Sequence, residues 1–300
     1  MTSPPEGFRS GFACFLGRPN TGKSTLTNAL VGSKVAITSD RPQTTRHAIR
    51  GIVSRPDGQL VLIDTPGFHR PRTLLGERLN DLVRSTVAEV DAVAFCVPAN
   101  EKIGPGDRFI VEQLHAIAGR TPAFAIVTKC DLVGKAIIGE RLLEISELAE
   151  WDEVVPVSAV DRYQVDLLAD LLMSRLPEGR PLYLDDELTD SPESVMVAEL
   201  VRGAALAGVR DELPHSIAVV VEELVRNGER IDIHAVMYVE RESQKGIVIG
   251  TKGARLRDVG TEARTHIEAL LGAKVYLDLR VKVAKDWQRD PKQLNRLGFS

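Results

Sequence analysis

Residues 17–24, Gly-Arg-Pro-Asn-Thr-Gly-Lys-Ser, have the spacing G-x-x-x-x-G-K-[ST] of a phosphate-binding loop. The two glycines allow the backbone to curl until several N–H groups point at one centre. Lys23 adds a positive charge there, and the Ser24 hydroxyl can ligate Mg²⁺. The apolar run 12–16 predicts a strand before the loop, and 24–31 predict a helix whose N-terminal dipole favours an anion. The predicted contacts to a nucleoside triphosphate are Gly17, Arg18, Pro19, Asn20, Thr21, Gly22, Lys23, Ser24 and Thr25.

Three later segments each follow an apolar run that predicts a strand. In the first, 64–67, Asp64 can hold a water bound to Mg²⁺, and the Gly67 N–H can reach a γ-phosphate. In the second, 128–131, Asp131 can accept two hydrogen bonds from the N1–H and N2–H₂ edge of guanine, which adenine lacks. The third, 157–159, can place a backbone N–H on guanine O6.

The order of these four segments predicts a guanine nucleotide site, because ligands of open α/β sheets bind at the C-terminal ends of the strands. The later segments contribute the predicted contacts Asp64, Thr65, Pro66, Gly67, Phe68, Thr128, Lys129, Cys130, Asp131, Val157, Ser158 and Ala159.

Composition agrees with a water-soluble chain of two domains. The 300 residues are 43% hydrophobic and 27% charged, and no apolar run approaches the length of a membrane span. The first residues have no basic-then-apolar signal pattern. Of the three cysteines, Cys14 and Cys96 lie in apolar runs and Cys130 lies in the guanine segment. This usage predicts reduced, buried thiols rather than disulfides or a metal site, and a cytoplasmic location.

Charge is distributed unevenly along a chain whose net charge is −4. Residues 243–300 hold twelve Lys or Arg against six acids, whereas 193–242 have the opposite balance. A basic end on an acidic chain suggests a face that binds a polyanion. On charge alone, a solvated helix face is the preferred explanation.

The order of predicted elements changes after residue 176. Alternating strands and helices end there, and the Pro-rich, acidic and aperiodic segment 177–192 predicts an interdomain linker. Beyond it, the pattern predicts a helix over 193–209, strands over 217–221 and 231–238 with a turn at Asn227-Gly228, a helix over 254–271 and a strand over 274–283.

Gly250-Thr-Lys-Gly253 follows the apolar run Ile247-Val-Ile249 and precedes the second helix. Glycines let an RNA backbone approach the peptide chain, while a helix N-terminus and basic side chains meet phosphates. A tight turn between two helices is the alternative. The predicted RNA contacts are Ile247, Ile249, Gly250, Thr251, Lys252, Gly253, Arg255 and Arg257.

Residues 1–176 resemble the translation-factor-type GTPases of the Era branch, with Gln43-Thr-Thr-Arg-His47 at the first switch segment. The C-terminal part resembles a type II KH domain, and the combination is that of the Era family. The resemblance implies an α/β fold. A P-loop GTPase domain, whose mostly parallel sheet has helices on both faces, precedes a smaller α+β KH domain. The expected bounds are 8–176 for the GTPase domain, 177–192 for the linker, 193–288 for the KH domain and 289–300 for a C-terminal tail.

The resemblance implies a GTP-hydrolysing switch that uses Mg²⁺, binds the single-stranded 3′ end of small-subunit (16S) rRNA and assists 30S ribosomal subunit assembly. It also implies peripheral membrane association, and we expect a monomer. The alternative is a membrane- or cell-cycle-linked signalling GTPase whose basic domain binds anionic lipid. A nucleotide kinase is a distant third. Gly250 and Gly253 favour RNA, because lipid binding needs charge but no glycine clamp.

The expected Mg²⁺ ligands are Ser24, Thr45 in preference to Thr44, and Asp64 through water. The expected switch and catalytic residues are Lys23, Thr44, Thr45 and Gly67.

Three residues shape the expected chemistry further. Phe68 stands where many GTPases have a glutamine, so hydrolysis should be slow without assistance. In relatives with the Pro-Asn pair, the residue matching Asn20 helps hold K⁺, which implies stimulation by K⁺. Thr128 replaces the usual Asn of the guanine segment, so weaker bracing of the loop is expected, with guanine selectivity kept by Asp131.

Overall fold

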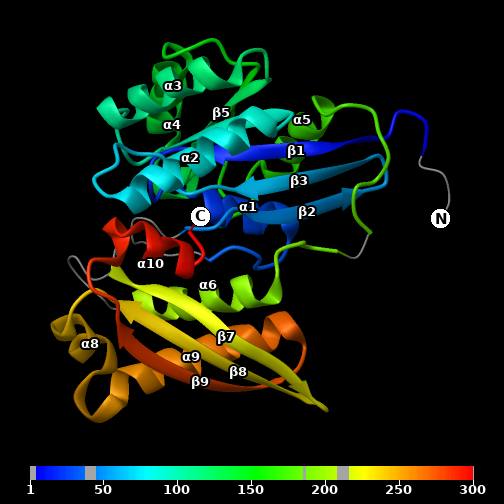
Figure 1. Ribbon diagram of the computed structural model, residues 1–300. Coiled ribbons are helices and arrows are strands. Elements are labelled where there is room, and N and C mark those ends of the chain that lie inside the picture. Colours follow the sequence, from blue (N-terminus) through cyan, green and yellow to red (C-terminus); the bar gives the residue numbers. More distant parts are fainter. Residues whose placement is uncertain (1–4, 38–44, 185–186, 208–215, 300) are drawn as a thin grey trace. The chain divides into compact units, whose positions relative to one another are not determined.

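The computed structural model describes residues 5–37, 45–184, 187–207 and 216–299 (Figure 1). The chain divides into two compact units. The first comprises 1–36, 45–70 and 79–190, and the second comprises 37–44, 71–78 and 191–300.

The first unit is built on a six-stranded sheet with the order β2-β3-β1-β4-β5-β6. Neighbouring strands are parallel except β2 and β3, which are antiparallel. The strands are β1 (Arg9–Leu16), β2 (Ile49–Arg55), β3 (Gly58–Asp64), β4 (Ala92–Pro98), β5 (Ala123–Thr128) and β6 (Glu153–Pro156). The helices are α1 (Lys23–Val31), α2 (Leu74–Glu89), α3 (Pro105–Ala118), η1 (Cys130–Leu132), α4 (Lys135–Ser146) and α5 (Val165–Ser174). The first turn of α2, up to residue 78, is assigned to the second unit.

Both faces of this sheet are covered, and the alternation along β1 shows why the strand is apolar throughout. Ala13 and Phe15 pack into the cluster with α1 and α5, whereas Cys14 and Leu16 pack into the cluster with α2, α3 and α4. A strand buried on both sides must place apolar residues at every position. The predicted α/β class and two-sided helix cover are confirmed.

The second unit has a three-stranded sheet in the order β7-β8-β9, with β7 and β8 antiparallel and β8 and β9 parallel. Its core joins α6, α9 and the inner face of the sheet through residues such as Val201, Ile233 and Ile267. The elements are α6 (Glu193–Leu206), β7 (Ala218–Asn227), β8 (Arg230–Val239), α8 (Glu242–Ile249), η2 (Thr251–Gly253), α9 (Ala254–Leu271), β9 (Lys274–Val283), η3 (Trp287–Arg289) and α10 (Pro291–Arg296).

The bounds predicted for α9 and β9 are confirmed, whereas β7 is longer than predicted. A bulge between Val221 and Glu223 interrupts the alternation of side chains between the two faces of the strand. The predicted strand therefore ended at Val221, although β7 continues to Asn227. The end of the helix predicted over 193–209 lies outside the described residues. No helix in the described ranges is long and apolar enough to cross a bilayer.

The segment expected to be a linker is hydrogen-bonded to the first unit. The Gln59 side-chain oxygen accepts the N–H groups of Leu182 and Tyr183 at 2.7 and 2.9 Å. The Ile52 N–H in edge strand β2 donates to the carbonyl of Leu188 at 2.9 Å. The expected tail includes α10, with Leu294 fully buried. The expected domain bounds stay a prediction.

Candidate functional site

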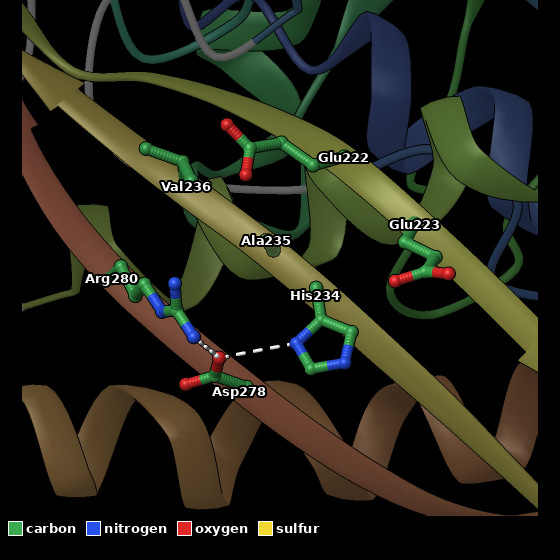
Figure 2. A pocket seen from close by; sticks show the side chains of 7 residues that line it. All are labelled: Glu222, Glu223, His234, Ala235, Val236, Asp278 and Arg280. Atoms are coloured by element: carbon green, nitrogen blue, oxygen red, sulfur yellow. Dashed lines mark hydrogen bonds and ion pairs between the residues drawn. The ribbon is translucent and has the colours of Figure 1, made fainter.

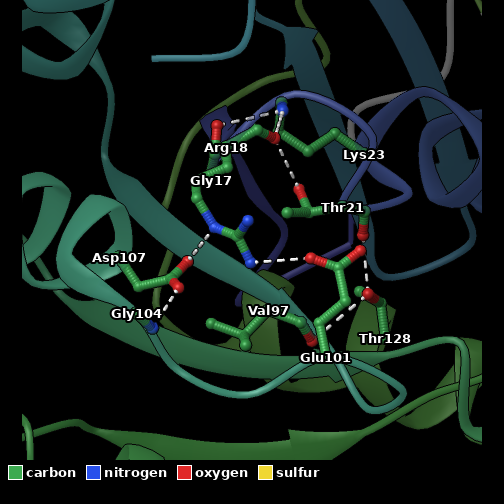
Figure 3. Close-up of polar contacts among 9 residues, drawn as sticks. All are labelled: Gly17, Arg18, Thr21, Lys23, Val97, Glu101, Gly104, Asp107 and Thr128. Atoms are coloured by element: carbon green, nitrogen blue, oxygen red, sulfur yellow. Dashed lines mark hydrogen bonds and ion pairs between the residues drawn. The ribbon is translucent and has the colours of Figure 1, made fainter. Parts of the chain in front are cut away.

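The phosphate loop joins β1 to α1, and its lysine is folded back onto the loop (Figure 3). Lys23 is buried, and its Nζ donates to the carbonyl oxygens of Gly17 at 3.2 Å and Arg18 at 2.9 Å. Burial lowers the pKa of Lys23, and the nearby Asp64 carboxylate opposes that shift. A phosphate bound in the loop would favour the charged lysine in the same way.

Three side-chain oxygens converge beside the loop. Ser24 Oγ lies 2.7 Å from Asp64 Oδ2 and 3.0 Å from Thr45 Oγ1, and Thr45 Oγ1 lies 3.1 Å from Asp64 Oδ2. Oxygens that bind one Mg²⁺ at roughly 2.0–2.1 Å are roughly 3.0 Å from their neighbours in an octahedron. The trio therefore fits Mg²⁺, either directly or with a water between the ion and Asp64. Thr44, the other threonine considered, lies outside the described residues.

The segment after β3 lies directly against the phosphate loop. A Cβ at Gly67 would be 2.6 Å from the backbone nitrogen of Pro19, so no larger residue fits there. The next N–H, that of Phe68, donates to the carbonyl of Gly17 at 3.1 Å. The Phe68 ring is buried and stacks on Phe109 of α3, with centroids 5.8 Å apart. Its side chain is therefore part of the core and offers no polar group to the reaction.

The guanine segment is tied to the loop by a threonine hydroxyl. Thr128 Oγ1 donates to the carbonyl of Thr21 at 2.6 Å and lies 3.3 Å from that of Val97. A hydroxyl is therefore sufficient to make this contact, and weaker bracing than with Asn stays a prediction.

Asp131 is oriented by the third segment. Ser158 Oγ donates to Asp131 Oδ1 at 2.7 Å and accepts the Asp161 N–H at 3.1 Å. The Cys130 N–H donates to the carbonyl of Val157 at 3.2 Å, which joins the two segments. Asp131 is exposed, so a base edge can reach its carboxylate, and the Ala159 N–H has no partner among the described residues. This pair of groups fits the N1/N2 edge and O6 of guanine.

The structure brings the four predicted segments to one edge of the sheet, while the role of Arg18 was missed. Its guanidinium binds Asp107 and Glu101, which follow β4. The only sequence signal for these acids was the capping pattern before α3, where the Gly104 N–H donates to Asp107 at 2.9 Å.

The predicted RNA loop lies between α8 and α9 in the second unit. Gly250 has φ +71°, and a Cβ there would be 2.7 Å from Cβ of Arg255. Thr251 and Lys252 are exposed, as is Arg257, and the Ile247 side chain is 55% exposed. The Arg255 guanidinium donates to the carbonyl of Ala207 at 3.0 Å, which connects the loop to the end of α6. The loop thus presents small, basic and apolar groups to solvent, while half-buried Ile249 and Gly253 complete the predicted set.

The outer face of the second unit's sheet has a hollow of about 420 Å³ (Figure 2). His234 Nδ1 and Arg280 Nη2 lie 3.1 and 2.8 Å from the Asp278 carboxylate, and Lys282 pairs with Glu222 at 3.3 Å. The His234–Asp278 and Lys282–Glu222 contacts cross strands, whereas Asp278 and Arg280 both belong to β9. The hollow contains none of the predicted site residues. Among the described residues, no group of three or more His, Cys, Asp and Glu could hold a metal ion.

Comparison with known proteins supports a GTPase domain in the N-terminal part of the chain and a KH domain in the C-terminal part. A family model described as 50S ribosome-binding GTPase matches residues 12–129, and a KH domain model matches 212–288. GTPase Era of Streptomyces coelicolor is 67% identical, covering 97% of this chain and 95% of that protein. GTPase Era of Mycolicibacterium smegmatis is 65% identical, covering 97% and 99%.

Two solved structures are similar over nearly the full length. One is Era in complex with MgGDPNP and nucleotides 1506–1542 of 16S ribosomal RNA, at 34% identity and a TM-score of 0.92, covering 98% of this chain and 99% of that one. The other is a single-residue variant of Aquifex aeolicus Era bound to GDP·AlF4⁻, at 33% identity and a TM-score of 0.92, covering 98% and 100%.

Proposed function

The chain belongs to the Era family of GTPases, and from this premise we propose that it binds the 3′ end of small-subunit rRNA and assists assembly of the 30S subunit. It has a GTPase domain that hydrolyses GTP and a KH domain. The RNA proposal rests mainly on the Gly250–Gly253 loop, in which Thr251 and Lys252 are exposed beside exposed Ile247. The relative solved with 16S rRNA nucleotides matches 98% of this chain, and the loop lies within that KH domain.

The nucleotide part of the proposal assigns roles to the converging side chains. Lys23 stabilises negative charge on the phosphates, and the Gly67 N–H donates to the γ-phosphate. Ser24 and Thr45 hold Mg²⁺, with Asp64 acting through a water. The ion would supply charge neutralisation at the phosphate oxygens. Asp131 and the Ala159 N–H select guanine.

K⁺ is a separate part of the proposal. Asn20 lies in the loop with φ +64°, a left-handed conformation that turns this part of the chain. We assign it as the residue that helps hold K⁺ next to the phosphates. Its carboxamide oxygen is a ligand that an alkali cation accepts, and Phe68 leaves the reaction without a polar side chain at the usual position.

The RNA part rests on the shape of the loop. Gly250 lets the chain turn tightly against Arg255, and Lys252, with φ +50°, is exposed in the same turn. An RNA backbone that crosses the loop would meet N–H groups and Lys252, and its bases would lie towards Ile247. A protein that assists ribosome assembly works in the cytoplasm, and we propose that location here. We also propose peripheral contact with the membrane and a monomeric state.

The deciding experiment measures binding of a short single-stranded RNA with the 3′-end sequence of 16S rRNA. Replacing Thr251 and Lys252 with Asp should weaken it severely, because carboxylates would face the phosphates, while GDP affinity stays nearly intact. If the wild-type protein neutralises three or four phosphates, log K should fall with log salt at a slope of about −2 to −3. A scrambled RNA and vesicles containing anionic lipid are the controls. Equal binding by the variant, or tighter binding to vesicles than to RNA, would favour the lipid-binding alternative.

A further inference from the structure

Arg18 of the phosphate loop is held by two carboxylates (Figure 3). Its Nε donates to Asp107 Oδ1 at 2.8 Å, and its Nη2 donates to Glu101 Oε2 at 2.9 Å. The Asp107 side chain is fully buried, and its other oxygen accepts the Gly104 N–H at the start of α3. Burial opposes the charge of Arg18, but these carboxylates more than offset that effect and raise its pKa. A buried carboxylate needs such a partner, so Asp107 fixes Arg18 to the first turn of α3.

The same helix holds the segment that follows β3. Phe109, two residues after Asp107, stacks on Phe68 with an interplanar angle of 17°. Arg70 and Arg84 lie over the Phe109 and Phe68 rings at 5.5 and 5.7 Å. The first turns of α3 therefore contact the phosphate loop through an ion pair and the Gly67 segment through an aromatic stack.

The two segments held by α3 also touch each other. The Phe68 N–H donates to the carbonyl of Gly17, and Gly67 lies against Pro19 without room for a Cβ. A shift of Arg18 would move its carbonyl oxygen, which accepts both Lys23 Nζ and Thr21 Oγ1. The spacing between the loop and Gly67 thus depends on how firmly α3 holds both.

We propose that Arg18 and Asp107 are positioning residues for GTP hydrolysis, with α3 as the common support that sets the phosphate loop against Gly67. The β-phosphate is held by the loop, whereas the γ-phosphate is also reached by the Gly67 N–H. Misplacement by about 1 Å at a reacting centre can cost about 10²-fold in rate. GDP has no γ-phosphate, so its binding does not use the Gly67 N–H.

The test compares Arg18→Gln, Asp107→Asn and the double variant with Arg18→Lys and a control, Arg55→Gln. Arg55 also binds two carboxylates of the first unit, Asp166 and Asp170 of α5, but both are exposed. It therefore controls for loss of an arginine ion pair away from the phosphate loop. Single-turnover GTP hydrolysis, the Kd values for GDP and for a non-hydrolysable GTP analogue, and the thermal midpoint with saturating GDP are measured. Phe109→Leu tests the aromatic half of the support.

We expect Arg18→Gln and Asp107→Asn each to slow single-turnover hydrolysis about tenfold or more, with GDP Kd changed less than about threefold. The double variant should lose little more than either single variant, because both remove one interaction. Arg18→Lys should recover part of the rate, and Arg55→Gln should retain it.

Three results would overturn the proposal. One is an unchanged hydrolysis rate in both single variants. Another is GDP affinity that falls in proportion to the rate, which indicates a general loss of loop structure. The third is a double variant whose losses add. If Asp107→Asn does not fold, the hydrolysis rate and the GDP Kd of Arg18→Lys and Phe109→Leu decide. A hydrolysis rate unchanged in both variants would also exclude α3 as the common support.

Discussion

The hydroxyl of Thr128 donates a hydrogen bond of 2.6 Å to the carbonyl oxygen of Thr21, which joins the guanine segment to the phosphate loop. The resemblance led us to expect an Asn at this position, and the shorter threonine side chain still reaches the phosphate loop. Both groups are buried, so the bond is protected from water.

Loss of that hydroxyl should weaken nucleotide binding. For Thr128→Ala we expect affinity for both GTP and GDP to fall about tenfold, since a buried carbonyl loses a partner worth roughly 1–1.5 kcal/mol. Calorimetric titration measures both constants. Thr128→Ser keeps the hydroxyl and is the matched control. Equal affinities of the Ala variant and the wild type would show that the bond does not hold the loop.

Guanine selectivity should depend on Asp131. We expect GTP to bind about 10⁴ times more tightly than ATP, because a bound adenine would cover the carboxylate without giving it donors. The side chain is exposed, so this penalty arises only when a base covers it. Asp131→Asn should shift preference towards xanthosine nucleotides, measured by competition with a fluorescent GDP. Similar Kd values of the wild type for GTP and ATP would contradict this assignment.

The roles that we assign to Ser24 and Thr45 in Mg²⁺ binding can be distinguished by mutation. Ser24→Ala should remove most GTP hydrolysis, because a hydroxyl ligand is lost in every nucleotide state. Thr45→Ala should weaken binding of a non-hydrolysable GTP analogue more than binding of GDP, since switch threonines contact the ion beside the γ-phosphate. The measurement is nucleotide affinity across a Mg²⁺ titration. Wild-type hydrolysis by Ser24→Ala would remove that residue from the metal shell.

Potassium should accelerate the reaction through Asn20. The intrinsic rate in Na⁺ should lie near roughly 10⁻⁴ to 10⁻³ s⁻¹, typical of an unassisted switch GTPase. We expect a markedly faster rate in K⁺ at equal ionic strength, and loss of the difference in Asn20→Ala. Phosphate release in matched KCl and NaCl buffers gives the answer. Equal rates for the wild type in the two salts would exclude a K⁺ site.

The cysteines should be unreactive in the folded protein. Burial raises the pKa of Cys96 to about 12 and that of Cys130 to about 11, both above the usual 9.0. Roughly 10⁻³ of Cys130 is then thiolate at pH 8, so iodoacetamide should label it only after unfolding.

The same shift predicts how stability depends on pH. Because the folded pKa of Cys130 is the higher one, its contribution is complete below about pH 9 and is lost as the pH rises through about 11. Between about pH 9 and 11 the thermal midpoint of the wild type should therefore fall relative to that of Cys130→Ala. Rapid labelling of Cys130 in the folded protein at pH 8 would contradict the buried thiol.

Much of the fold was predictable because its signals are local. The phosphate loop, the helix 254–271 and the strand 274–283 each follow from a contiguous pattern, and the structure has them where they were expected. The bulge in β7 was missed, since one extra residue breaks the alternation on which strand prediction relies. The sequence did not predict that the segment 177–190 is attached to the first unit. Backbone N–H groups of this segment donate to the Gln59 side chain, and such bonds leave no pattern of residue types in the segment.

The sequence by itself determined which chemical groups are available: a phosphate loop, a carboxylate for guanine and a glycine loop among basic residues. These depend on neighbours in the chain, so their spacing is visible in the sequence. Only the tertiary structure decided which distant residues hold them in place. Arg18 and Asp107 are 89 positions apart, and Thr21 and Thr128 are 107 apart. Such pairs form because packing of helices on a sheet brings buried polar groups together, where each must find a partner.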